Sequence, residues 1–212
     1  MPALQEPQVF ALADRALAAV VAQIRDEQWS MVMPESFRTR VQDRRPTLYE
    51  IVNYHAYDDA WVPDVLAGRT MAEVGVDKHK GDLLGEDRSA AFRAMVDRAV
   101  AAAESLDDLD RTVHLSFGDY TARQFLWQAN SFRGLRAHDL ATVIGVDADL
   151  PPELVLGLWE ELSPVAEEWR AIGIFQAAVP VAEDAPLLDR LLGLTRARPG
   201  RLRLRTRCGT RG

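Results

Sequence analysis

Two segments with helical periodicity carry polar residues whose types and spacing could do chemistry. His55 and Asp59 are four residues apart in the first segment, and Arg136 and Asp139 are three apart in the second. Residues at these spacings lie on one face of a helix. A neutral imidazole can accept a proton near pH 7, and a guanidinium binds a carboxylate or phosphate through its planar fork. The four side chains therefore predict a polar site between two helices.

The apolar pattern of the second segment places its charges on the inward face. With 100° per residue and Phe125 at 0°, Phe132 lies at about −20° and Arg136 at about +20°. Asp139 falls at about −40°, whereas His138 falls at about −140°, away from this stripe. Burying a charge is costly unless it is paired or used. We therefore expect Arg136 and Asp139 to have either a partner or a function.

Two interpretations of these charges stay open. In the first, Arg136 pairs with Asp139 and Asp59 in a buried salt-bridge network that only stabilises the fold. In the second, Arg136 also holds an anionic small molecule, with His55 as the proton donor or acceptor. Asp59, Phe132 and Asp139 would then line the ligand. A paired arginine can still contact a ligand, so the two interpretations are compatible.

Helical periodicity predicts the elements that position these residues. Long amphipathic helices are expected over about residues 8–28, from Thr47 to the Pro63–Gly68 region, over about 89–106 and over about 121–145. Thr47 with Glu50, and Thr121 with Gln124, have the spacing of capping boxes. Shorter helices are expected over about 152–162, 164–172 and 187–194. Residues 69–87 are expected to form a long connection, and TVHLSFGDY an irregular or extended link.

Length and composition favour a small globular protein, and the dominance of helical periodicity over β-alternation predicts an all-α fold. We expect one domain over residues 1–195, a helix bundle with extra short C-terminal helices. The Arg-rich tail, residues 196–212, contains seven arginines and no acid and is expected to be disordered. A formal net charge of −7 argues against nucleic-acid binding. The absence of a long apolar run and of a signal-peptide pattern predicts a cytoplasmic protein without membrane contact.

Two stretches resemble the DinB-like four-helix bundles, which include the N-terminal domain of mycothiol-dependent maleylpyruvate isomerases. The stretch TLYEIVNYHAYDDAWVPDVLAG is similar to their metal-binding histidine helix. The stretch FRGLRAHDLATVIG is similar to their later helix, which often ends in His-x-x-Asp-Leu-Ala followed by Gly. The resemblance spans about residues 8–170. It implies an up-down-down-up bundle and small-thiol chemistry, with mycothiol as co-substrate.

The resemblance also implies a divalent metal, zinc or nickel, held by three side chains. His55 matches the histidine of the second helix, and the family's other ligands are a Glu and a His four residues apart on the later helix. Aligned on the Asp-Leu-Ala sequence, this chain has Phe132 and Arg136 at those positions. Aligned on His138, it has Gly134 in place of the Glu. The first alignment indicates a lost metal site, because an arginine has donors only and repels a cation. The second leaves His55 and His138 as metal ligands.

The sequence therefore predicts a DinB-like bundle with a polar pocket between its second and fourth long helices. If the chain is an enzyme, the resemblance implies isomerisation or S-transfer on an anionic substrate. His55 would be the catalytic group and Arg136 the anion anchor. The alternatives are a non-catalytic bundle that binds a small molecule or only stabilises itself, a metal-dependent member using His55, and a homodimeric interaction module.

Overall fold

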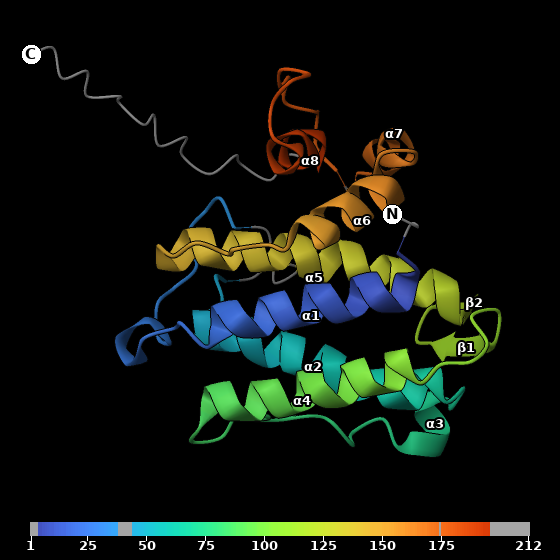
Figure 1. The fold of residues 1–212 in the computed structure, drawn as a ribbon. Coiled ribbons are helices and arrows are strands. Elements are labelled where there is room, and N and C mark those ends of the chain that lie inside the picture. Colours follow the sequence, from blue (N-terminus) through green and yellow to red (C-terminus); the bar gives the residue numbers. More distant parts are fainter. Residues whose placement is uncertain (1–3, 38–43, 174, 196–212) are drawn as a thin grey trace, which may run out of the picture. The chain divides into compact units, whose positions relative to one another are not determined.

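A computed structural model of the protein describes residues 4–37, 44–173 and 175–195 (Figure 1). The predicted Arg-rich tail lies outside these residues. In the described residues, the chain forms eight α-helices, one short 3-10 helix and one two-stranded antiparallel hairpin. This mostly helical structure confirms the predicted all-α class. None of the described helices has the length and apolarity needed to cross a membrane.

The elements follow the predicted order. They are α1 (Glu6–Val21), η1 (Asp26–Gln28), α2 (Leu48–Leu66), α3 (Met71–Val74), α4 (Arg88–Glu104), β1 (Thr112–Leu115), β2 (Gly118–Thr121), α5 (Ala122–Ile144), α6 (Pro152–Leu162), α7 (Ala166–Ala171) and α8 (Leu187–Thr195). The long helices expected from periodicity correspond to α1, α2, α4 and α5. The first is shorter than predicted, since residues 26–28 form η1 instead of continuing α1.

Capping residues fix the ends of the two helices that carry the predicted site. At the start of α2, the Thr47 hydroxyl accepts a hydrogen bond from the Glu50 amide at 3.3 Å, and the Thr47 amide donates to Glu50 at 2.8 Å. Thr121 and Gln124 form the same reciprocal pair at the start of α5. Gly145 ends α5 with a left-handed backbone, φ 78°, which glycine adopts without steric cost.

The long helices lie side by side, but not all pairs are equally close (Figure 1). Helix α1 packs along both α5 and α4, and α4 packs along α2. Helices α2 and α5 have far fewer close backbone contacts, so the space between them must be bridged by side chains. The short helix α6 packs on α5 and α1. The candidate site lies in the wide interface between α2 and α5.

The connection between α2 and α4 is anchored by a buried carboxylate near the end of α2. Lys78 donates to Asp64 at 2.9 Å, the His79 Nε2 lies 3.0 Å from the same oxygen, and Arg69 forms an ion pair with the other. Burial alone would raise the pKa of Asp64, but the hydrogen bonds from His79 and Lys78 and the charge of Arg69 lower it below its ordinary value. The segment predicted as a long connection is therefore held at defined points, and it contains the short helix α3.

The contacts divide the chain into two compact units, Met1–Leu162 and Ser163–Gly212. The first unit contains α1 to α6 and the hairpin. In the second, the Val179 amide donates to Gly193 O at 2.9 Å, and the Trp169 and Phe175 rings lie 5.2 Å apart. The single domain predicted for residues 1–195 stays a prediction.

Candidate functional site

The buried face of α5 is centred on Arg133, not on Arg136. The residues of α5 that are buried with Arg133 include Leu126, Ala129, Ala137 and Leu140. On the helical wheel this face lies about 80° away from the predicted stripe. The side chain of Phe132, in that stripe, is 41% exposed. The prediction that Phe132 points into the core is therefore wrong, whereas Arg136 lies at the edge of the buried face with its side chain mostly buried. Alanines, which carry little weight in an apolar pattern, share the face that packs with Leu126 and Leu140.

Arg133 bridges the carboxylates of two other helices. Its Nε donates to Asp59 Oδ1 on α2 at 3.0 Å, and its Nη2 contacts the same oxygen. The same Nε lies 2.5 Å from Asp14 Oδ1 on α1. All three side chains are buried. Asp59, predicted as a partner of Arg136, therefore pairs with Arg133, and this buried triad of Asp14, Asp59 and Arg133 joins α1, α2 and α5.

The buried triad has two acids and one base. Burial raises the pKa of Asp14 well above its ordinary value; the charge of Arg133 opposes this shift and that of Asp59 adds to it. Burial also raises the pKa of Asp59, again opposed by Arg133. Despite its burial, the pKa of Arg133 is raised by Asp14 and Asp59. Two carboxylates that share one guanidinium resist being ionised together, so the triad favours holding a proton.

His55 is buried beside this triad and is held in its neutral form. Its side chain is 3% exposed, and its Nδ1 has no hydrogen-bond partner among the described residues. Burial lowers the pKa of His55 well below its ordinary value, and the charges of Arg136 and Arg133 lower it further. A neutral imidazole has one nitrogen able to accept a proton.

Arg136 lies at the rim of the same interface, among aromatic rings. Its guanidinium carbon lies 4.5 Å from the centre of the Phe37 ring and 5.7 Å from that of Phe132. Its Nη1 forms an ion pair with Asp139 at 3.7 Å, as predicted. The side chain of Arg136 is only 11% exposed, and burial lowers its pKa. Burial likewise raises the pKa of Asp139, opposed by Arg136.

We call the group of Tyr54, His55, Phe132, Arg136 and Asp139 the α2–α5 site. Tyr54 joins it because its ring meets the His55 ring edge-on at 6.1 Å. Of the predicted site residues, His55, Phe132, Arg136 and Asp139 belong to this site. Asp59 lies in the buried triad instead. The site thus combines a neutral imidazole, a guanidinium and two partly exposed aromatic rings.

The residues near His55 do not fit the divalent metal that the family resemblance implies. Within the described part of the chain, no three side chains of His, Cys, Asp or Glu are grouped so that they could hold a metal ion. His138 is half-buried on α5 and completes no such group with His55. Arg136 and Arg133 both place positive charge near His55, which opposes cation binding.

The sequence reasoning missed Arg133 and Asp14. The sequence neighbours of each residue do indicate that it is buried. Arg133 is surrounded at helical spacing by small and aliphatic residues such as Ala129 and Ala137, and Asp14 sits between apolar residues in α1. Comparison with protein-family models, with curated proteins and with solved structures gave no match.

Proposed function

We propose that this chain is a DinB-like bundle whose α2–α5 site binds an anionic small molecule. The course of the chain supports the first part: α1 and α5 run in one direction and α2 and α4 in the other (Figure 1). This is the up-down-down-up order that the resemblance implies. The long connection through α3 makes it feasible, because it returns the chain so that α2 and α4 run parallel.

The environment of Arg136 is the observation that carries the proposal. Its guanidinium is mostly buried against Phe37 and Phe132, which removes water from one side and fixes its plane. Its partner Asp139 is about one third exposed and lies 3.7 Å away. Because Asp139 is only three residues further along the same helix, it does not approach the guanidinium from across the interface. A carboxylate arriving from solvent can share such a guanidinium, and its hydrogen bonds are strengthened by the reduced contact with water.

The activity that we propose for this site is thiol-dependent isomerisation or S-transfer on an unsaturated carboxylate. His55, neutral at pH 7, takes the proton of a small thiol such as mycothiol. The thiolate adds to the carbon–carbon double bond while Arg136 holds the carboxylate. For isomerisation, rotation about the resulting single bond and loss of the thiolate return the double bond in its other geometry, and no atom is gained or lost. For S-transfer, His55 returns its proton to the carbon.

Binding of maleate, a small unsaturated dicarboxylate, tests the anion site by titration calorimetry. The Arg136→Gln variant is expected to bind maleate at least about tenfold more weakly than the unchanged chain, since a charge-assisted hydrogen bond contributes about 1.5–3 kcal/mol. Arg98→Gln, an exposed arginine on α4, is the matched control and should bind normally. Equal binding by Arg136→Gln and the unchanged chain would overturn the proposal.

The catalytic part has a separate test. His55→Asn should keep maleate binding and lose thiol-dependent conversion of maleate to fumarate, followed by proton NMR with a low-molecular-weight thiol. Binding without conversion in the unchanged chain would favour the alternative, a small-molecule-binding protein without catalysis.

A further inference from the structure

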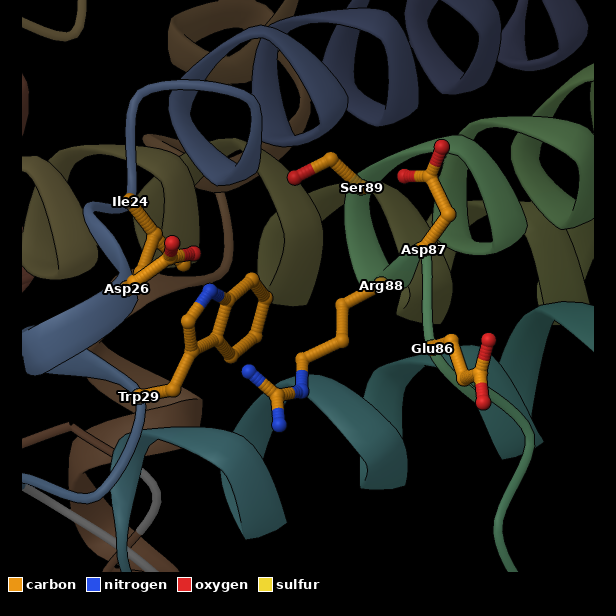
Figure 2. Close-up of a pocket in the computed structure, with 7 residues that line it drawn as sticks. All are labelled: Ile24, Asp26, Trp29, Glu86, Asp87, Arg88 and Ser89. Carbon is orange, nitrogen blue, oxygen red and sulfur yellow. The ribbon is translucent and has the colours of Figure 1, made fainter.

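The hollow between η1 and the start of α4 and the buried triad both gather charged side chains, but these are satisfied in different ways. In the hollow, the guanidinium carbon of Arg88 lies 5.4 Å from the centre of the Trp29 ring, and the carboxylates of Glu86 and Asp87 point away (Figure 2). Both of these acids are exposed, so water can satisfy them. The triad is enclosed, and its polar atoms need partners inside the protein.

Two buried polar atoms on α2, one helical turn apart, have no hydrogen-bond partner among the described residues. They are His55 Nδ1 and Asp59 Oδ2. His55 is 3% exposed and Asp59 is fully buried. Residues four apart on a helix lie on one face with their Cβ atoms about 5–6 Å apart, and helical side chains lean toward the N-terminal end of the helix. The carboxylate of Asp59 is therefore directed toward the turn that carries His55.

Arg133 uses one oxygen of Asp59 and leaves the other. Its Nε donates to Oδ1 at 3.0 Å, and its Nη2 contacts the same oxygen. Asp14 lies beside the same Nε, but within the described residues it accepts no hydrogen bond at either oxygen. Hydrogen bonds from a guanidinium favour the ionised form of a carboxyl group. The proton that the triad holds therefore belongs on Asp14, and Asp59 stays ionised as an acceptor.

We propose that Asp59 is a positioning residue for His55, whose Nδ1–H donates to Asp59 Oδ2 directly or through one buried water. Nδ1 then carries the hydrogen of the neutral ring, and Nε2 keeps its lone pair for the proton of the thiol. When Nε2 takes that proton, the imidazolium lies beside a carboxylate, which offsets the repulsion from Arg133 and Arg136. This catalytic consequence rests on the function proposed above, whereas the tautomer of His55 does not.

The tautomer is measured on the full chain at pH 7, without ligand, by two-bond ¹H–¹⁵N NMR correlation of the imidazole rings. Protonated and unprotonated ring nitrogens have distinct ¹⁵N shifts, and the His55 signals are those missing from the spectrum of His55→Asn. The unchanged chain should show Nδ1 protonated and Nε2 unprotonated. The opposite tautomer, which a hydrogen bond from Arg133 to Nδ1 would select, would overturn the proposal without any variant.

Two matched variants assign this effect to one carboxylate of the triad. In Asp59→Asn, the amide oxygen can still accept from Arg133 while the amide NH₂ faces Nδ1, so His55 should change to the tautomer protonated at Nε2. Asp14→Asn removes a carboxylate from the same triad but on α1, and should leave the tautomer unchanged. An unchanged tautomer in Asp59→Asn, or the same change in both variants, would contradict the assignment to Asp59.

Activity gives a second measurement. Asp59→Asn should bind maleate within about twofold of the unchanged chain but convert it to fumarate at least about 100-fold more slowly, since a general base contributes about 10²–10⁴-fold. Normal conversion by Asp59→Asn would overturn the positioning role. If the unchanged chain neither bound nor converted maleate, the proposed function would fail by itself, because the tautomer of His55 and its response to the two variants would still decide this inference.

Discussion

Glu161 is a carboxyl group whose surroundings favour its protonated form. The buried Asn130 donates to Glu161 Oε1 at 2.8 Å, while Asn130 Oδ1 and Glu161 Oε2 are both buried without a hydrogen-bond partner in the described residues. Burial raises the pKa of Glu161 to about 8; the hydrogen bond from Asn130 opposes this shift and the charge of Glu6 adds to it. A protonated Glu161 could donate to Asn130 Oδ1 and satisfy both atoms.

The Glu161→Gln variant is expected to be more stable than the unchanged chain at alkaline pH. A carboxyl whose pKa is raised on folding stabilises the fold fully below its ordinary pKa, 4.5, and this stabilisation is lost as the pH rises through about 8. The glutamine amide makes the same hydrogen bonds at every pH. The difference in free energy of unfolding, measured by urea denaturation, should grow from near zero below pH 4.5 to at least about 1 kcal/mol above pH 8.

Glu160→Gln serves as the control, because this neighbouring side chain is exposed. Its stability difference from the unchanged chain should stay within about 0.5 kcal/mol at all pH values. A pH-independent difference for Glu161→Gln would mean that Glu161 is ionised in the folded protein.

The sequence predicts the types of polar residue that are buried between α2 and α5 better than their positions. His55 lies buried in the α2–α5 interface as expected, and Arg136 pairs with Asp139. The buried arginine, however, is Arg133. The position of Phe132 was misleading, because this large apolar residue lies at the rim while alanines and leucines share the packed face around Arg133. Burial of small side chains depends on how closely neighbouring helices approach, which a single sequence does not specify.

The close packing of α6 against α1 depends on a glycine. A Cβ atom on Gly157 would lie 2.7 Å from Val9 Cγ2 of α1. Val9 is fully buried, and its branched side chain has little rotamer freedom in a helix. Alanine would favour the helix by about 1 kcal/mol in isolation, but overpacking costs about 1–3 kcal/mol. We therefore expect Gly157→Ala to lower the free energy of unfolding by about 1 kcal/mol.

A double-mutant cycle with Val9→Ala checks this explanation. Removing the valine methyl groups makes room for the new Cβ, so the two changes together should cost less than their sum by at least about 0.5 kcal/mol, measured by thermal or urea unfolding. Leu156→Ala, on the exposed side of α6, should change stability little by comparison. Strict additivity of Gly157→Ala and Val9→Ala would show that the contact is relieved in some other way.

Local sequence signals predict the ends of the helices well. The capping boxes at Thr47 and Thr121 and the left-handed Gly145 placed the ends of α2 and α5 correctly. The hairpin was expected only as an irregular or extended link. Its strands have four residues each and pair across a tight turn, with Val113 opposite Tyr120. Strands this short provide too few residues for an alternating pattern to be recognised.

The wide α2–α5 interface is held by charge rather than by close packing. Helices α1, α4 and α2 pack in succession, and α1 packs on α5. The remaining interface is crossed by the pair of Arg133 and Asp59, with Asp14 as the third member. Buried ion networks seldom stabilise more than an apolar core of the same volume. We infer that the triad makes this interface polar and that the protein is less stable than it would be with apolar side chains at these three positions.

Two variants of the buried triad test this inference. Arg133→Met alone leaves two buried carboxyl groups without their cation and should cost about 3–5 kcal/mol in the free energy of unfolding. Adding Asp14→Leu and Asp59→Leu removes those carboxyl groups and should return the stability to that of the unchanged chain or raise it by about 1–4 kcal/mol. Urea denaturation measures both, and Arg98→Met on the exposed face of α4 is the control. If the triple variant were as unstable as Arg133→Met, the triad would be a stabilising element in its own right. Recovery would show instead that the triad's charges cost stability in this interface.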